Sequence, residues 1–321
     1  MAKIYTVEWT PAILAHPALQ IGMAANWWGI VGEKLTKMLG RISKSSDIIS
    51  GILGSGAEHD GAPYSLTEEF VSVYRMHSLV PDNIAFFSAS SGKHIKTIPV
   101  PDSTFDKAQP PLHENPFTLP DAFYSFGIKH PGAITHNNYP SFLRNLPTPD
   151  GQTRDLGTVD ILRDRERGVP RYCAFRRHLR MSVPKTFEDL TGGDAALAGE
   201  LREAYGEDGL ERVDALVGSH AEPVIPGFGF SKTAFRVFIL MASRRLKADR
   251  FIGGHGEWSE GTYTKVGFWW VQNSGMKDVL GRHFPELGAL LERNGGRNVF
   301  APWVKMEESD KYRGVETNAP A

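Results

Sequence analysis

Helical periodicity without regularly alternating strands is the feature that most constrains the fold of this chain. Apolar residues recur at helical spacing in several segments, namely 1–39, 65–80, 118–127, 156–167, 171–180, 195–205, 209–217, 231–248 and 275–293. Two strand-like runs, FFSAS and HIKTIPV, suffice for one small hairpin, and residues 40–64 form a Ser/Gly-rich loop. The pattern predicts a mainly α fold with long loops, and argues against a nucleotide-binding α/β fold.

Charge and cysteine content exclude several classes of protein. Thirty-six Lys and Arg residues against 37 Asp and Glu give a net charge of −1, so bulk electrostatics do not favour a nucleic-acid partner. The single cysteine, Cys173, excludes an internal disulfide, a Cys-rich zinc site and a c-type haem attachment motif. We find neither a secretory signal nor a transmembrane segment, and expect a cytoplasmic protein.

Residues 65–80 give the strongest helix prediction. Ser65 and Glu68 have the spacing of a capping box, and Pro81 follows the segment. Within this predicted helix, Phe70 and Val73 share a face with Tyr74 and His77, because residues three and four apart lie on the same side. We therefore expect a buried stripe that contains a tyrosine and a histidine.

This pair has two interpretations. A hydrogen-bonded histidine and a packed tyrosine in an ordinary core is the more frequent arrangement. Alternatively, a neutral imidazole on a rigid helix is a good axial ligand for haem iron, and a tyrosine one turn earlier would lie beside the macrocycle. Composition and spacing leave both interpretations open.

The run YRMHSLVPD, preceded by EEFVSV, resembles the proximal-histidine helix of the animal haem peroxidase and cyclooxygenase superfamily, and more narrowly that of fatty-acid α-dioxygenases. Further segments resemble the same family in the same order: 5–14, 163–181, 213–222, 234–251, 262–271 and 277–287. The resemblance implies a haem-peroxidase-like helical domain over residues 1–305, followed by a charged tail at 306–321.

By this resemblance, His77 matches the proximal ligand of haem b, and Tyr74 matches the tyrosine that becomes a radical. The implied reaction starts when a peroxide oxidises the haem, which in turn oxidises Tyr74. The tyrosyl radical then abstracts hydrogen from the α-carbon of a fatty acid, and dioxygen adds to give a 2-hydroperoxy acid. Fatty acid, dioxygen and peroxide are thus the implied small-molecule partners.

The resemblance also implies a site for the substrate carboxylate. Arg250 is the best match to the family's carboxylate-binding arginine, with Arg244 and Arg245 as alternatives, and a solvated helix end is equally compatible with these basic residues. Thr10 matches a threonine that helps to hold the carboxylate. Tyr5 stands where relatives carry a histidine, which removes a possible positive charge.

Two further positions concern the haem pocket. Arg165 or Arg167 is expected to approach the haem propionates, although consecutive charges around a helix end also suit surface ion pairs. Cys173 stands where the family generally has an asparagine that hydrogen-bonds the proximal histidine. A thiol is a poorer partner, so either the iron–histidine bond is tuned differently or Cys173 is simply a small buried side chain.

The resemblance begins at the middle of the family's sequence. The distal histidine and the calcium-binding loop of relatives precede that point, so we expect the chain to lack the N-terminal part of the domain and the calcium site. It would then be the proximal half of a longer enzyme, and a separate distal-half polypeptide is a possible partner. The alternatives are a peroxidase with another substrate and a non-catalytic helical remnant. A fatty-acid substrate is also compatible with peripheral membrane contact.

Overall fold

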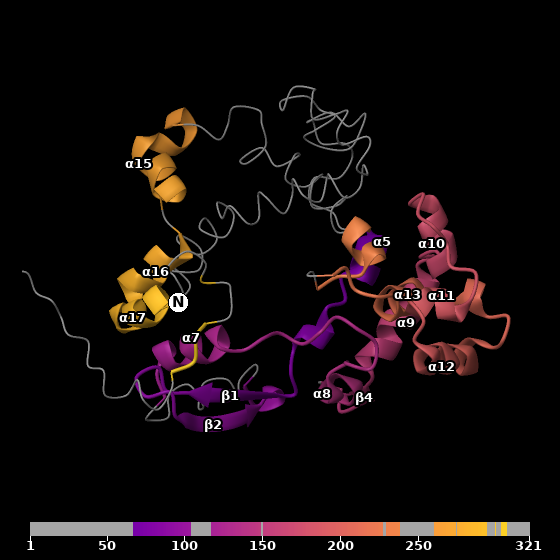
Figure 1. The fold of residues 1–321 in the computed structure, drawn as a ribbon, viewed down its shortest axis with the longest axis horizontal. Coiled ribbons are helices and arrows are strands. Elements are labelled where there is room, and N and C mark those ends of the chain that lie inside the picture. The colour runs from indigo at the N-terminus through magenta and orange to yellow at the C-terminus, as the bar shows by residue number, and fades with distance from the viewer. Residues whose placement is uncertain are drawn as a thin grey trace, which may run out of the picture. The chain divides into compact units, whose positions relative to one another are not determined.

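The computed structural model describes residues 67–103, 117–148, 150–226, 229–237, 260–273, 275–293, 299 and 303–306. Within these residues the fold is mainly α-helical with two small two-stranded sheets, as the sequence predicts (Figure 1). The described residues form two compact units, one within 81–132 and 266–306, the other within 67–80 and 133–265. The prediction of one domain over 1–305 with a tail at 306–321 stays a prediction.

The first unit contains the predicted hairpin. Its elements are β1 (Asn83–Phe87), β2 (His94–Pro99), η3 (Val100–Ser103), α7 (Leu119–Gly127), α16 (Met276–His283), η6 (Pro285–Leu287) and α17 (Gly288–Arg293). The strands pair antiparallel, with Asn83 opposite Pro99. Helix α7 packs beside β1 and begins at a capping box of Thr118 and Asp121, which satisfies two backbone N–H groups that the helix leaves unpaired (Figure 1).

The second unit is a cluster of short helices (Figure 1). Its elements are α5 (Glu68–Val73), η2 (His77–Leu79), α8 (Ser141–Arg144), β3 (Leu146–Pro147), β4 (Thr153–Arg154), α9 (Leu156–Glu166), α10 (Tyr172–His178), α11 (Phe187–Thr191), α12 (Ala195–Tyr205), η5 (Leu210–Arg212) and α13 (Ala215–Ala221). Asp155 caps α9, Thr186 caps α11 and Asp194 caps α12, each through a side-chain oxygen. Residues 232–237 are also helical.

Two apolar clusters hold the second unit together. One joins α10 to α11, α12 and α13 and includes Tyr172, Leu190, Leu201 and Val213. The other joins α5 to α10 and α13 through Phe70, Val73, Phe175 and Ala215. The second cluster places the end of α5, and therefore the segment that carries Tyr74 and His77, against the rest of the unit.

Most of the helices predicted within the described residues are confirmed. Residues 118–127, 156–167, 171–180 and 195–205 match α7, α9, α10 and α12 within a few positions. The segment 275–293 is helical with a break at Pro285, as expected, while 209–217 separates into η5 and α13. One further helix, α15 (Glu260–Asn273), is interrupted at Thr264, where φ is 64°. None of the described helices is long and apolar enough to cross a bilayer.

The helix predicted at 65–80 is wrong in both its start and its end. It begins at Glu68 with Thr67 as the N-cap, and ends at Val73. The carbonyl oxygen of Arg75, which a continuing helix would use for its own ladder, accepts a hydrogen bond from His220 Nε2 at 3.2 Å instead. Beyond it, Leu79 N–H donates to Met76 O, the shorter spacing of a 3₁₀ turn.

Candidate functional site

The side chain of His77 lies in a partly buried setting dominated by one carboxylate. Its Nδ1 lies 3.9 Å from Oδ2 of Asp160, and its side chain is 27% exposed. The other oxygen of the same carboxylate, Oδ1, pairs with Arg75 at 3.0 Å. The ring of Tyr139 lies 5.6 Å from the imidazole, tilted by 59°. Because Nδ1 faces the carboxylate, Nε2 is the nitrogen left for a metal.

Burial favours the neutral form of His77. Burial lowers the pKa of His77 below its usual value, against the opposing attraction of Asp160 and with the repulsion of Arg75. A neutral imidazole retains the lone pair that a metal requires. Burial likewise raises the pKa of Asp160, although Arg75 and His77 both lower it. The imidazole and the carboxylate behind it therefore suit an axial ligand of haem iron.

Tyr74 lies differently from the sequence-based expectation. It is the C-cap of α5 and is 46% exposed, whereas Phe70 and Val73 are buried. Its ring stacks on that of Phe70, with centroids 4.9 Å apart and an interplanar angle of 18°. The predicted buried stripe is therefore wrong at Tyr74, because α5 ends before this residue. The Tyr74 side chain is therefore partly exposed beside the core residue Phe70.

Two aspartates one turn apart on α9 support this region. Asp160 and Asp164 are both buried, at 4% exposure each. Asp164 accepts a hydrogen bond of 2.5 Å from Ser72 Oγ and so ties α9 to α5. Sequence reasoning missed Asp160 as a functional residue. The sequence does show that Asp160 and Asp164 are four positions apart, and so lie on one face of the helix predicted at 156–167.

A cavity of about 220 Å³ adjoins this carboxylate. Its lining includes Arg75, Ser78, Tyr139, Asp160 and His220. Among the described residues, the buried polar atoms without a hydrogen-bond partner are Arg75 Nε, His77 Nδ1, Ser78 Oγ, Tyr139 OH and Asp160 Oδ2. Such a concentration of unpaired groups is unusual in a folded interior and typical of a functional or hydrated site. Burial, and secondarily Asp160, raises the pKa of Tyr139 to about 12.

Cys173 lies in a different environment from the one expected of a partner of His77. It is fully buried in the α10–α13 cluster, and its thiol donates to the carbonyl oxygen of Leu210 at 3.6 Å. Within the described residues no hydrogen bond joins it to His77. These contacts are those of a small buried side chain, the alternative that the sequence left open.

We expect Cys173 to be unreactive in the folded chain. Burial raises the pKa of the Cys173 thiol, so at pH 8 less of it is the reactive thiolate than in the unfolded chain. Reaction with a disulfide reagent, followed by absorbance, should be at least about 10-fold slower in buffer than in urea. Equal rates in the two solvents would contradict the packed position of this side chain.

Arg165 and Arg167 each have a carboxylate partner. Arg165 binds Asp214 through Nε at 3.0 Å and through one terminal nitrogen at 2.7 Å, and Arg171 pairs with the same carboxylate. Arg167 pairs with Glu68 at 2.8 Å. Both arginine side chains are about half exposed. Their predicted role toward haem propionates stays a prediction, and the contacts observed are ion pairs at the edge of α9.

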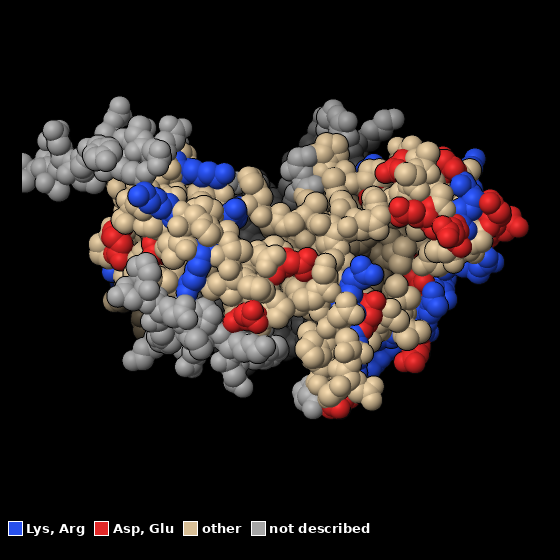
Figure 2. Space-filling model, turned by 90° about the horizontal axis from the view of Figure 1, so that it is seen from below, with Lys and Arg blue, Asp and Glu red and all other residues tan. Residues whose placement is uncertain are grey.

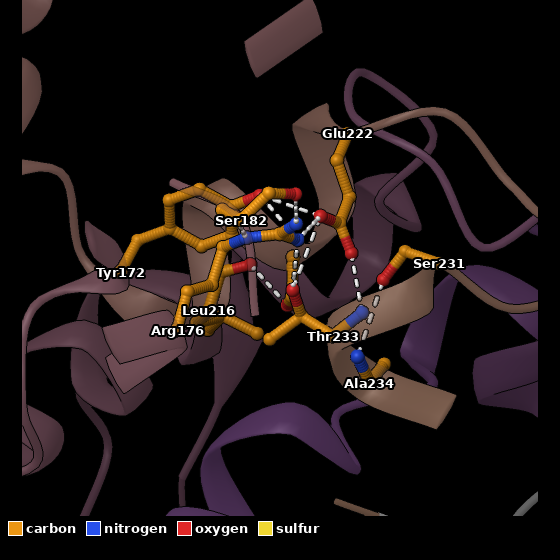
Figure 3. Close-up of polar contacts among 9 residues, drawn as sticks. Tyr172, Arg176, Ser182, Leu216, Glu222, Ser231, Thr233 and Ala234 are labelled. Carbon is orange, nitrogen blue, oxygen red and sulfur yellow. Dashed lines mark hydrogen bonds and ion pairs between the residues drawn. The ribbon is translucent and has the colours of Figure 1, made fainter. Parts of the chain in front are cut away.

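The most buried ion pair of the described residues joins α10 to the residue that follows α13 (Figure 3). Arg176 pairs with Glu222 at 2.5 Å, with side chains only 8% and 7% exposed. The same carboxylate accepts from the Tyr172 hydroxyl at 2.5 Å and from the backbone N–H of Thr233 at 2.6 Å. Arg176 also donates to the carbonyl oxygen of Ser182 at 2.6 Å. These hydrogen bonds connect α10, α13 and residues 231–234.

Charge on the surface drawn in Figure 2 is mixed. Basic and acidic side chains are interspersed rather than gathered into one patch (Figure 2), in keeping with the net charge of −1. The predicted carboxylate-binding residues Tyr5, Thr10 and Arg250 lie outside the described residues.

Comparison with known proteins identifies the family of this chain. A sequence profile described as animal haem peroxidase matches residues 1–294. The chain belongs to the animal haem peroxidase family. The predicted family membership is therefore confirmed, and haem is the cofactor that this family implies. The neutral imidazole of His77, backed by a buried carboxylate, is a donor that fits haem iron.

Particular relatives point to one branch of the family. The chain is 40% identical over 318 residues to an alpha-dioxygenase PIOX of Oryza sativa subsp. japonica, covering 94% of this chain and 50% of the relative. A crystal structure of the Oryza sativa fatty acid alpha-dioxygenase matches with a TM-score of 0.70 and 38% identity, over 94% of this chain and 50% of that one. A variant of the same protein solved with palmitic acid matches equally well. The chain thus spans about half the length of these relatives, and its helical fold is that of haem peroxidases.

Proposed function

We propose that this chain is the haem-ligating, proximal half of a fatty-acid α-dioxygenase. The observation that carries the proposal is the neutral imidazole of His77, held before a buried carboxylate and three residues after an accessible tyrosine. Its similarity to a protein solved with palmitic acid supports a long-chain fatty acid as the substrate. Haem b bound at His77 would supply the oxidant that removes one electron from Tyr74.

The chain's own residues would then carry out the hydrogen transfer. Tyr74, having lost an electron and its phenolic proton, takes a hydrogen atom from the α-carbon of the fatty acid. Dioxygen adds to the resulting carbon radical, and the peroxyl radical takes the hydrogen atom back from the Tyr74 hydroxyl. The product is a 2-hydroperoxy fatty acid, and the tyrosyl radical is regenerated. The exposure of Tyr74 supports this role, because its phenol must meet the substrate.

We assign the binding and orientation of the substrate to residues that lie outside the described part of the chain. Arg250 would pair with the carboxylate, and Thr10 and Tyr5 would donate hydrogen bonds to it. Fixing the carboxylate brings the α-carbon, one bond away, to a defined place beside Tyr74. The alkyl chain would lie in an apolar channel that excludes water from the radical.

The proposal concerns the proximal half of the enzyme only, because the chain spans about half the length of its relatives. In the family, the distal histidine and the calcium site precede the matched region. We expect the chain alone to bind haem weakly and to have little oxygenase activity, because one face of the haem would lack its protein cover. A peroxidase with a different substrate is the second candidate, and the tyrosine at position 74 favours the oxygenase.

Replacing Tyr74 with phenylalanine tests the reaction. The chain is loaded with haem, mixed with the N-terminal half of the Oryza sativa relative, and given palmitic acid while dissolved oxygen is recorded. Tyr74→Phe should lose at least about 100-fold in oxygen uptake, because phenylalanine has no O–H to oxidise. Oxidation of a phenolic dye by peroxide, which does not need this tyrosine, should persist.

Tyr205→Phe is the matched control, because it removes a phenol that bonds Asp214 at 2.9 Å, away from His77. It should retain most of the oxygen uptake. Full oxygenation by Tyr74→Phe would exclude the proposed radical site. Rapid turnover by the chain without its complement would contradict the half-enzyme proposal.

A further inference from the structure

We propose that Asp160 is the positioning residue of His77, accepting a hydrogen bond from the imidazole Nδ1–H and directing Nε2 toward the iron. The inference rests on the proposed function in that His77 is taken as the haem ligand. It assigns to Asp160 the role that the sequence comparison gave to position 173. The proposal rests on the surroundings of the two oxygens of the Asp160 carboxylate.

The first step concerns the two unpaired atoms. His77 Nδ1 and Asp160 Oδ2 are both buried and both lack a hydrogen-bond partner among the described residues. They lie 3.9 Å apart, about 1 Å beyond the usual length of an N–H···O bond. A small rotation of the imidazole, or one bridging water, would satisfy both atoms at once. Leaving both unpaired would cost on the order of 1–3 kcal/mol each.

The second step concerns the orientation of the carboxylate. Arg75 binds Oδ1 of Asp160 at 3.0 Å, which fixes the plane of the group and leaves Oδ2 facing the imidazole. Asp160 is itself on α9, whose next turn is anchored by the bond between Asp164 and Ser72. The contact with Arg75 and the Asp164–Ser72 bond therefore position the Asp160 carboxylate without haem.

The third step concerns the cavity. Asp160 shares the 220 Å³ space with Ser78 Oγ, Tyr139 OH and Arg75 Nε, which lack partners within the described part of the chain. Most of the surface that lines this space is apolar, and these few polar groups gather on the side of the Asp160 carboxylate. A carboxylate behind a metal-bound histidine fixes the tautomer and makes the imidazole a stronger donor to the metal.

Cys173 does not compete for this role. Its thiol donates to Leu210 O at 3.6 Å, and its neighbours are the apolar side chains of the α10–α13 cluster. Because the family generally has an asparagine at this position, the cysteine removes one hydrogen-bond partner of His77. Asp160, on a different helix, supplies another.

The wild-type chain without haem provides the first test. Nitrogen-15 NMR of the imidazole distinguishes the two neutral tautomers. We expect His77 to carry its proton on Nδ1, and Asp160→Asn to weaken that preference. A proton on Nε2 in the wild-type chain would overturn the proposal, whatever the outcome for haem, and this readout needs no variant to fold.

The second test uses the haem-loaded chain. Asp160→Asn should weaken haem binding by about 10- to 100-fold, lower the iron–histidine stretching frequency in the ferrous form, and raise the reduction potential. Asp160→Glu should restore part of each change. Asp164→Asn is the matched control, one turn away on α9 and equally buried, and should leave the stretching frequency unchanged. Equal shifts from both asparagine variants, or none from Asp160→Asn, would overturn the proposal.

Failure of the proposed function gives a different result. If haem binds without His77, the stretching mode assigned to this histidine is absent from the wild-type protein as well. The tautomer of His77 in the haem-free chain would still report on Asp160. The two outcomes are thus distinguishable.

Discussion

Replacing His77 with alanine is expected to weaken haem binding by more than about 100-fold. This loss exceeds the one expected for Asp160→Asn, because alanine removes the proposed metal ligand itself. The imidazole is the group that the neighbouring carboxylate and its own low pKa prepare for a metal. Alanine leaves the cavity and Asp160 in place but supplies no electron pair. Titration with haem, followed by the Soret band, measures the change, and addition of imidazole should restore part of it.

His178→Ala is the matched control for this experiment. His178 is exposed at the end of α10, in the same compact unit as His77. Its removal should leave the haem titration unchanged and so exclude a general effect of losing a histidine. An unaltered Soret band in His77→Ala would contradict the proposed coordination, and the haem-dependent part of the proposal would have to be abandoned.

Replacing Arg176 with methionine is expected to destabilise the fold by about 3–5 kcal/mol, because it leaves the carboxylate of Glu222 buried without its cation. Methionine preserves the apolar stem, so the effect reports on charge rather than on a cavity. The buried hydroxyl of Tyr172 and the N–H of Thr233 still contact that carboxylate, but neither can neutralise it. The free energy of unfolding in urea measures the loss.

A neighbouring ion pair provides the control. Arg177 follows directly on α10 and pairs with Glu211, both side chains being about half exposed. Arg177→Met should cost no more than about 1 kcal/mol, since water screens exposed pairs. In the double variant Arg176→Met with Glu222→Gln, the loss should be smaller than the sum of the two single losses. Equal effects of Arg176→Met and Arg177→Met would show that burial of the pair has no energetic consequence.

Sequence reasoning predicts elements whose signals are local. Helices α9 and α12 begin after Asp155 and Asp194, whose side chains cap the first turn, so their starts are visible in the sequence. The hairpin of β1 and β2 is bounded by turn-forming residues in the same way. Such features need no knowledge of what packs against them.

The end of α5 could not be predicted by the same means. The segment has helical periodicity up to residue 80, yet the Arg75 carbonyl bonds with His220, which lies 145 positions later in the chain. Tertiary contacts of this kind override local preference. The backbone between Tyr74 and His77 is thus held by a residue that is distant in the sequence.

The candidate site was predicted in part. Resemblance to the family identified His77 and Tyr74, whose roles stay predictions until haem is bound and activity is measured. The sequence shows Asp160 only as one of two acids four positions apart, because its importance depends on its distance to His77 and on Arg75, which the fold brings near. Cys173 stays a predicted departure from the family, and its thiol donates a hydrogen bond to the carbonyl oxygen of Leu210 in the folded chain.

The break after Val73 has a mechanical consequence. Tyr74 is the C-cap of α5 and His77 begins η2, so the backbone between these two side chains is not one continuous α-helix. On an unbroken α-helix the Cα atoms of these two residues would be separated by about 4.5 Å along the helix axis. Because the helix is broken between them, two different elements set the directions of the Tyr74 phenol and the His77 imidazole, and His220 bonds to the Arg75 carbonyl between the two.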